Sequence, residues 1–204
     1  PIDVPNNSTT QVELFPAVQS VRCEKELVVD GTRSWLYRGA PLLDVNQSGG
    51  TNMDVAVYLR IKNDEKSGMG LPLPEGRVRV SQLDPADGRI EFLGEDAIKH
   101  TPKDEEINIK VGNAFDVVGE RKRTNYRVDS AGHRMWESFE IELRNHKDSA
   151  VDVVVLESLY RTANWAIEKN SDRFEKLNSN RVRFKVKVPA NSEKTIAYTV
   201  YYTW

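Results

Sequence analysis

Two short segments of the chain share one pattern, and each ends in asparagine. Residues 57–63 read VYLRIKN, and residues 139–145 read FEIELRN. When Asn63 is aligned with Asn145, apolar residues fall at the same alternate positions. Alternation with a period of two turns one face of a strand to a core and the other to water. The pattern therefore predicts two related β units in one chain.

A second pattern, a turn followed by a strand, is also repeated. Residues 4–14 read VPNNSTTQVEL, residues 188–198 read VPANSEKTIAY, and TPKDEEINI at 101–109 is a looser copy. Proline and small polar residues favour turns, and an alternating run follows each of these turns. Such turns are common in β proteins, so coincidence is the competing explanation. The shared Val-Pro-x-Asn-Ser favours a true repeat.

The distance from each asparagine to the next repeated proline is also similar. Asn63 precedes Pro102 by 39 residues, and Asn145 precedes Pro189 by 44. Residues 112–123 collect two glycines and a charged run, so we expect the boundary between the units there.

These repeats predict an all-β protein made of two immunoglobulin-like antiparallel β-sandwich units. We expect them at residues 1–115 and 116–204, because such a unit usually has about 100 residues. Since the chain begins at Pro1 without a signal peptide, we also expect it to be a fragment. Residues 9–15 or 20–29 would then pair with segments that precede Pro1.

Turn and helix signals are short. The Asp-Gly pair at 87–88 predicts a hairpin, and residues 130–132 predict a second turn. Only residues 95–100 and 171–177 are candidates for helix, each of one or two turns. Eight alternating apolar residues are expected in the core: Leu59, Ile61, Ile141, Leu143, Phe184, Val186, Ile196 and Tyr198.

Composition excludes several classes of protein. A net charge of −2 and a pI near 6.0 argue against nucleic acid as a partner, since that function needs a basic face. No apolar run approaches the roughly 18 residues of a transmembrane helix. Cys23 is the single cysteine, so the fold has no intrachain disulfide.

Several motifs together resemble a bacterial domain-of-unknown-function family, which forms the C-terminal region of mucoidy-inhibitor-like exported proteins. The motifs are GMGLPLPEG at 68–76, FLGED at 92–96, VGNAFDV at 111–117, LRNHK at 143–147 and the C-terminal VPANSEKTIAYTVYY. The resemblance spans about residues 4–202. It implies a β-rich domain of a larger envelope protein, located in the periplasm or at the cell surface, and it brings no catalytic residues.

No set of residues forms a recognisable active site. His100 lies near several carboxylates that could hold a hard cation, but a solvated acidic loop explains this segment better. Cys23 lacks a nearby histidine in the sequence and is favoured as a structural residue. We therefore expect no catalytic residues, no cofactor and no metal ion.

Aromatic and basic residues offer a candidate interaction surface. Arg121, Arg123 and Tyr126 form a small basic stretch that suits an anionic lipid or polysaccharide, although charges that protect an edge strand against unwanted pairing are the favoured explanation. Trp35 and Tyr37 lie in an apolar, irregular segment. Of the other tryptophans, Trp136 and Trp165 are expected to fill the core, because they border alternating strands.

Three functions remain open. The leading one is a non-enzymatic structural or interaction domain of an exported bacterial envelope protein, whose partner is a protein or polysaccharide of the envelope. The second is a carbohydrate-binding module that uses exposed aromatic rings, and the third is a metal-assisted hydrolase at His100. An exposed strand edge would also permit pairing between copies of the chain.

Overall fold

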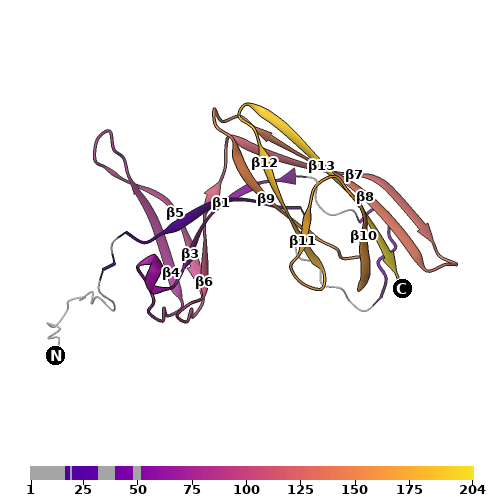
Figure 1. The fold of residues 1–204 in the computed structure, drawn as a ribbon, viewed down its shortest axis with the longest axis horizontal. Coiled ribbons are helices and arrows are strands. Elements are labelled where there is room, and N and C mark those ends of the chain that lie inside the picture. Colours follow the sequence, from indigo (N-terminus) through magenta and orange to yellow (C-terminus); the bar gives the residue numbers. More distant parts are fainter. Residues whose placement is uncertain (1–16, 19, 32–39, 48–51) are drawn as a thin grey trace, which may run out of the picture.

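The computed structural model describes residues 17–18, 20–31, 40–47 and 52–204. These residues form strands and a single short 3-10 helix, and none of them lies in an α-helix (Figure 1). The elements are β1 (Cys23–Asp30), β2 (Asn52–Met53), β3 (Val55–Lys62), η1 (Glu65–Ser67), β4 (Gly76–Leu83), β5 (Ile90–Ile98), β6 (Glu106–Asn113), β7 (Val117–Asp129), β8 (Arg134–Asn145), β9 (Val151–Ser158), β10 (Asn164–Asn170), β11 (Phe174–Lys176), β12 (Arg181–Val188) and β13 (Ser192–Thr203). The expectation of an almost wholly β protein is confirmed.

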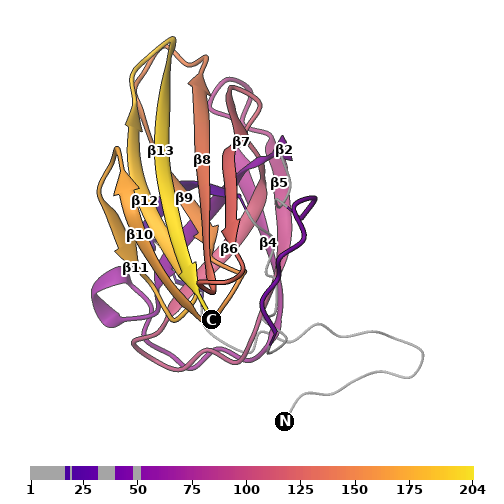
Figure 2. The ribbon, with the colours of Figure 1, turned by 90° about the vertical axis from the view of Figure 1, so that its right-hand side faces the viewer.

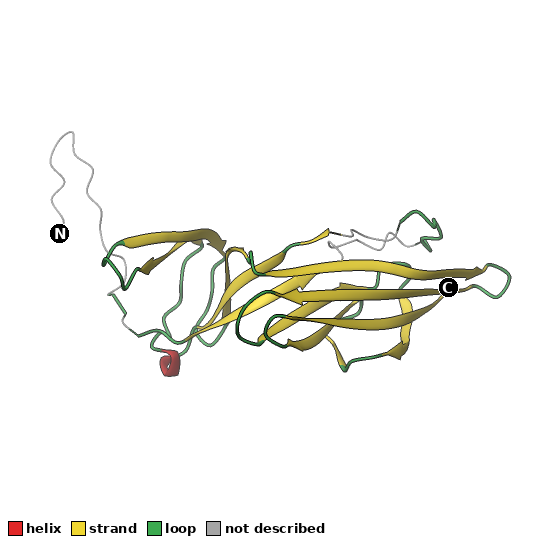
Figure 3. Ribbon diagram, turned by 90° about the horizontal axis from the view of Figure 1, so that it is seen from above, coloured by secondary structure: helices red, strands yellow, loops and turns green. Residues whose placement is uncertain are grey.

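The strands are arranged in three sheets. The six-stranded sheet has the order β11-β12-β9-β1-β3-β6, and the five-stranded sheet has the order β10-β13-β8-β7-β2. Strands β4 and β5 form a separate hairpin. Figures 2 and 3 show the long strands of the five-stranded sheet lying against β9, β11 and β12. The strand pairs are antiparallel except for β1 and β9, which run parallel.

The main core fills the space between the two large sheets. Alternate residues of β8, β12 and β13 point into it, as the period of two predicts. Six of the eight expected core residues are buried: Ile141, Leu143, Phe184, Val186, Ile196 and Tyr198. The expectation was wrong for Leu59 and Ile61, which are only half-buried. They lie on β3 toward β6, where the five-stranded sheet does not cover the six-stranded one (Figure 1).

Strand β1 links the two ends of the six-stranded sheet. Residues 23–29 pair with β3, and residues 27–30 pair with β9. The expectation that residues 20–29 pair outside the chain is wrong for residues 27–29, because both of their edges are used internally. Residues 23–26 pair on one edge only, with β3. Residues 9–15 lie outside the described residues. The expected boundary at 115/116 falls in the loop between β6 and β7. Strands from both ranges nevertheless share one sheet.

Neither of the two segments that were candidates for helix forms one. Residues 95–98 belong to β5, and residues 174–176 form β11. Each segment is held by a neighbouring strand, β4 or β12. A helix of one or two turns has too few internal hydrogen bonds to compete with such pairing. The expected Asp-Gly turn does join β4 to β5, and Gly88 has the positive φ of 72° that this turn requires.

The two aligned asparagines occupy equivalent positions. The buried Asn63 side chain donates from Nδ2 to Leu71 O at 2.8 Å and to Pro102 O at 2.9 Å. The buried Asn145 side chain donates from Nδ2 to Ser149 O and Pro189 O, both at 2.9 Å. Each asparagine thus follows a strand and fastens the repeated proline turn beside it.

The repeated turns share backbone geometry as well. Asp104, two residues after Pro102, has φ of 70°, and Asn191, two residues after Pro189, has φ of 47°. Asp and Asn are the non-glycine residues that adopt this left-handed conformation most readily. The sequence repeat therefore corresponds to a repeated turn in three dimensions.

We expect Asn63→Ala and Asn145→Ala each to lower the free energy of unfolding by about 1–3 kcal/mol, because each removes a buried side chain and its hydrogen bonds to two backbone carbonyl groups. Urea unfolding monitored by tryptophan fluorescence measures the loss. The exposed Asn108 provides a matched asparagine, and Asn108→Ala should cost less than about 0.5 kcal/mol. Equal costs at all three positions would show that the two side chains do not hold the turns.

Candidate functional site

Arg121 is buried between the two large sheets. Its guanidinium group pairs with Glu157 of β9, with Nη2 2.9 Å from Oε2, and lies 3.8 Å from the centre of the Phe139 ring. The Tyr198 hydroxyl group donates to the same carboxylate. The expectation that Arg121 lies on an accessible surface is wrong, because Val117, Gly119 and Arg121 alternate onto the inner face of β7.

Close packing and charge both fix this pair. A Cβ atom at Gly31 would lie 1.7 Å from Glu157 Oε1, so only glycine leaves room for the carboxylate. Burial alone would lower the pKa of Arg121, but the negative charge of Glu157 outweighs it and raises the pKa above the usual value. The guanidinium group therefore stays charged and is used inside the fold.

A second buried pair lies nearby. Arg161 Nη2 is 2.7 Å from Glu137 Oε1, and neither side chain is exposed to solvent. Arg123 Nη1 lies 3.3 Å from the same carboxylate oxygen. Burial lowers the pKa of Arg161, but the hydrogen bond and charge of Glu137 raise it above the usual value. The single negative charge of Glu137 is thus shared between two guanidinium groups, and the Arg161 group is the closer one.

Residues 40–47, which we call the strap, cross this charged cluster and supply backbone carbonyl oxygens to it. Arg161 Nη1 donates to Leu42 O at 2.9 Å and to Asp44 O at 2.7 Å. Further donors to the strap are Arg161 Nη2 and the Tyr160 hydroxyl group to Gln47 O, Arg123 Nη2 to Val45 O, and the Tyr126 hydroxyl group to Leu43 O. The cluster therefore binds a segment of its own chain.

Three of the five candidate interaction residues are thus placed. Arg121 is internal, whereas Arg123 and Tyr126 are partly exposed and contact the strap. Trp35 and Tyr37 lie outside the described residues. Arg121 therefore connects β7 to β9, and Arg123 connects β7 to β8 and to the strap.

The buried tyrosines give the protein a sensitivity to base. Burial and the charge of Glu137 raise the pKa of Tyr160 to about 12, and burial raises the pKa of Tyr198 and Tyr202 well above 10. In the unfolded chain these groups ionise near pH 10. As the pH rises, the unfolded state therefore loses these protons before the folded state does. The stability that the three buried tyrosines contribute is fully present below about pH 10 and is lost above it.

We expect the free energy of unfolding to fall as the pH rises from about 10 to 12. Urea titrations across this range measure it, and absorbance at 295 nm reports tyrosinate. The Tyr160→Phe variant should show a shallower slope. Stability that stays constant from about pH 9 to pH 11.5 would contradict the raised pKa values.

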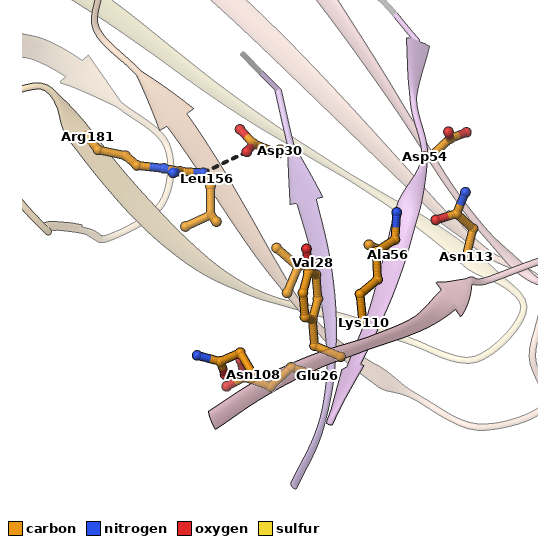
Figure 4. Close-up of a pocket in the computed structure, with 11 residues that line it drawn as sticks. Glu26, Val28, Asp30, Asp54, Ala56, Asn108, Lys110, Asn113, Leu156 and Arg181 are labelled. Atoms are coloured by element: carbon orange, nitrogen blue, oxygen red, sulfur yellow. Dashed lines mark hydrogen bonds and ion pairs between the residues drawn. The ribbon is translucent and has the colours of Figure 1, made fainter. Parts of the chain in front are cut away.

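A groove runs across the outer face of the six-stranded sheet (Figure 4). Its volume is about 560 Å³. Strands β1, β3, β6, β9 and β12 all contribute, so the groove spans the shared sheet. The lining residues are Glu26, Val28, Asp30, Asp54, Ala56, Tyr58, Asn108, Lys110, Asn113, Leu156 and Arg181.

The charges in the groove are only partly paired. Arg181 Nη2 lies 2.7 Å from Asp30 Oδ2 at one end, and Glu26 lies 3.3 Å from Arg60. Asp54 and Lys110 form no ion pair with any described residue. As far as the structure describes the chain, the groove therefore holds one carboxylate and one ammonium group that have no ion-pair partner.

Sequence reasoning missed this groove. The outward positions of β1 and β3 follow from alternation, because Glu26 and Val28 lie opposite Tyr58 and Ala56. The partner on the other side is the parallel strand β9, more than 100 residues away in the chain. No local sequence pattern predicts such a pairing.

The other candidate residues do not form a reactive centre. His100 is exposed and accepts from the Glu75 backbone N–H through Nδ1. No group of three or more His, Cys, Asp or Glu side chains in the described part of the chain could hold a metal ion. Cys23 is exposed on β1.

Trp136 differs from its expected position. It lies on the outer face of β8 and not in the core, because Met135 and Glu137 take the inward positions. Its ring centre is 5.1 Å from that of Tyr201, and the Arg127 guanidinium group lies 3.8 Å from its ring centre. Trp165 does pack against the core. The five-stranded sheet therefore carries two half-exposed rings in neighbouring strands.

Among the described residues, no helix has the length and apolar character needed to cross a membrane. Comparison of the chain with protein-family models, with curated proteins and with solved structures found no match in any of the three.

Proposed function

We propose that this chain is a non-enzymatic interaction domain of an exported bacterial envelope protein, and that the groove of the six-stranded sheet holds its partner. The observation that carries the proposal is the groove itself, which spans five strands and in which Asp54 and Lys110 form no ion pair within the described part of the chain. The buried arginines and carboxylates are engaged with each other and with the strap, which leaves them a structural role.

The chemistry of the groove favours a protein segment as the partner. Asn108 and Asn113 each offer a donor and an acceptor, as an extended backbone requires. The free carboxylate and ammonium groups suit a segment with charges of both signs, since complementary charges set specificity and association rate. Tyr58 adds a ring that can cover an apolar side chain.

We also propose that the fold is built from two related units. Two immunoglobulin-like units are supported by the equivalent asparagines and by the paired positive-φ turns. The resemblance to the C-terminal region of mucoidy-inhibitor-like proteins supports the envelope location. The envelope location is tested by the protein in its own cell.

The test is made on the protein expressed from its own reading frame. After cell fractionation we expect it in the periplasm or at the cell surface, where native gels should show a complex larger than the free protein. Lys110→Glu and Asp54→Lys should release the free protein, because each reverses a groove charge. The matched control is Lys122→Glu, an exposed lysine on β7. A cytosolic protein would contradict the location, and a complex unchanged by both groove variants would contradict the site.

Carbohydrate binding is the second candidate, and the Trp136–Tyr201 pair favours it. Aromatic rings on a sheet face can stack on sugar rings, and the Ser138 and Thr199 hydroxyl groups lie in the next position along the same two strands. Envelope polysaccharide should then quench tryptophan fluorescence of the native protein but not of Trp136→Leu. Equal responses would exclude this face.

A further inference from the structure

The β4–β5 hairpin carries an exposed apolar patch. Leu83, Ile90 and Phe92 are 63%, 75% and 62% exposed. Leu83 pairs with Ile90 across the hairpin, and Ser81 pairs with Phe92, so the three apolar side chains share one face. Contiguous exposed apolar side chains usually mark a contact surface.

The opposite face of the hairpin is already used by the fold. Val78, Val80 and Ile98 are half-buried there, and a Cβ atom at Gly94 would lie 2.3 Å from Val111 O of β6. Figure 1 shows the hairpin projecting on the side of the molecule away from the C-terminal sandwich. The apolar patch therefore lies on the face of the hairpin that points away from β6.

Charges along the hairpin form two groups of opposite sign. At the base of the hairpin, Arg77 and Arg79 share Glu95, with N–O distances of 2.8 and 2.7 Å, which leaves one positive charge. The turn at the tip carries Asp84, Asp87 and Arg89, which leaves one negative charge. The apolar patch lies between these two groups.

We propose that the hairpin is a self-association surface, and that its occupant is the same hairpin of a second copy of this chain. A two-fold axis through the patch makes both copies present the same residues to each other, as a C2 contact requires. The two hairpins then lie antiparallel, with the negative tip of one over the positive base of the other. Phe92 meets the apolar patch of the second copy at the centre.

This contact differs from the strand-edge pairing expected from the sequence, because it uses side chains on a sheet face. It also explains why apolar residues stand at outward positions of an otherwise charged hairpin. The small size of the patch predicts a weak dimer, since stable interfaces bury more surface. It is independent of the groove, which is formed by other strands.

Sedimentation velocity over a concentration series reaching ~300 µM tests the proposal. The native protein should pass from monomer to dimer. Leu83→Glu should raise the dimer dissociation constant at least tenfold, because it places a charge in the apolar contact. The matched control Leu177→Glu alters a leucine that is 40% exposed after β11, and it should leave the constant unchanged.

A charge-exchange experiment tests the antiparallel arrangement. The double variant Arg77→Glu/Arg79→Glu and the variant Asp87→Lys should each be monomeric, because like charges then face each other in both halves of the dimer. Mixing them should restore a dimer that contains one copy of each, since both halves become complementary. Circular dichroism confirms that each variant is folded.

Two results would overturn the proposal. One is a native protein that stays monomeric throughout the series, whether or not it binds phosphatidylcholine vesicles. The other is a dimer that Leu83→Glu and Leu177→Glu weaken equally. Separate variants in the groove and in the hairpin keep failure of this inference distinct from failure of the proposed function.

Discussion

Replacing Arg161 with methionine is expected to lower the free energy of unfolding by about 3–5 kcal/mol. The substitution removes the closest partner of the fully buried Glu137 carboxylate and three hydrogen bonds to the strap, at Leu42, Asp44 and Gln47. Arg123, at 3.3 Å, compensates only part of the buried charge. Urea unfolding of the native and variant proteins measures the difference.

Two further variants show whether burial is the cause. Arg134→Met removes an exposed ion pair with Asp129, in which the side chains are 49% and 39% exposed, and should cost at most about 1 kcal/mol. Combining Arg161→Met with Glu137→Gln should cost less than the sum of the single losses, because the second change removes the unpaired charge. A loss at Arg161 no larger than that at Arg134 would show that the cluster does not hold the strap.

Leu143→Ala is expected to lower the free energy of unfolding by about 2–5 kcal/mol, through lost burial and the cavity that remains. Leu143 has no exposed surface and lies near the C-terminal end of β8, which is flanked by β7 and β13. Leu177→Ala, at a position 40% exposed, is the matched control and should cost less than about 0.5 kcal/mol. Similar small losses for both leucines in a denaturant titration would place Leu143 on the wrong face of its strand.

Local signals in the sequence were sufficient for much of the fold. Alternation predicted the buried faces of β8, β12 and β13, because a period of two is enforced wherever one face of a sheet is buried. The Asp-Gly pair predicted the β4–β5 turn. The alignment of Asn63 with Asn145 also had structural meaning, since each side chain binds the repeated proline turn.

Long-range pairing was beyond these signals. Nothing near β1 in the sequence indicates that it lies parallel to β9. Leu59 and Ile61 show the same alternating pattern as the buried Leu143. They are less buried only because the five-stranded sheet does not extend over this part of β3, and the sequence does not reveal how far that sheet extends. The groove depends on the same pairing, and so its residues could not be assembled from the sequence.

The buried charges were misplaced for a different reason. Residue type suggested that Arg121 faces water. Its position is nevertheless in phase with Val117 and Gly119, so all three residues lie on the inner face of β7. Glu137 likewise shares the inner face of β8 with Met135 and Phe139. Position within the strand was therefore a better guide than polarity, but the partners Arg161 and Glu157 come from other strands or loops and had to be seen in three dimensions.

The most direct test of the central claim is photo-crosslinking from the groove in living cells. A photoreactive amino acid replaces Asn108 in the groove or, as the control, the exposed Glu140 on the outer face of β8. We expect one defined envelope protein to be cross-linked from position 108 and not from position 140, and Lys110→Glu to abolish that product. Equal products from both positions, or no product from position 108, would contradict the assignment of the groove as the interaction site.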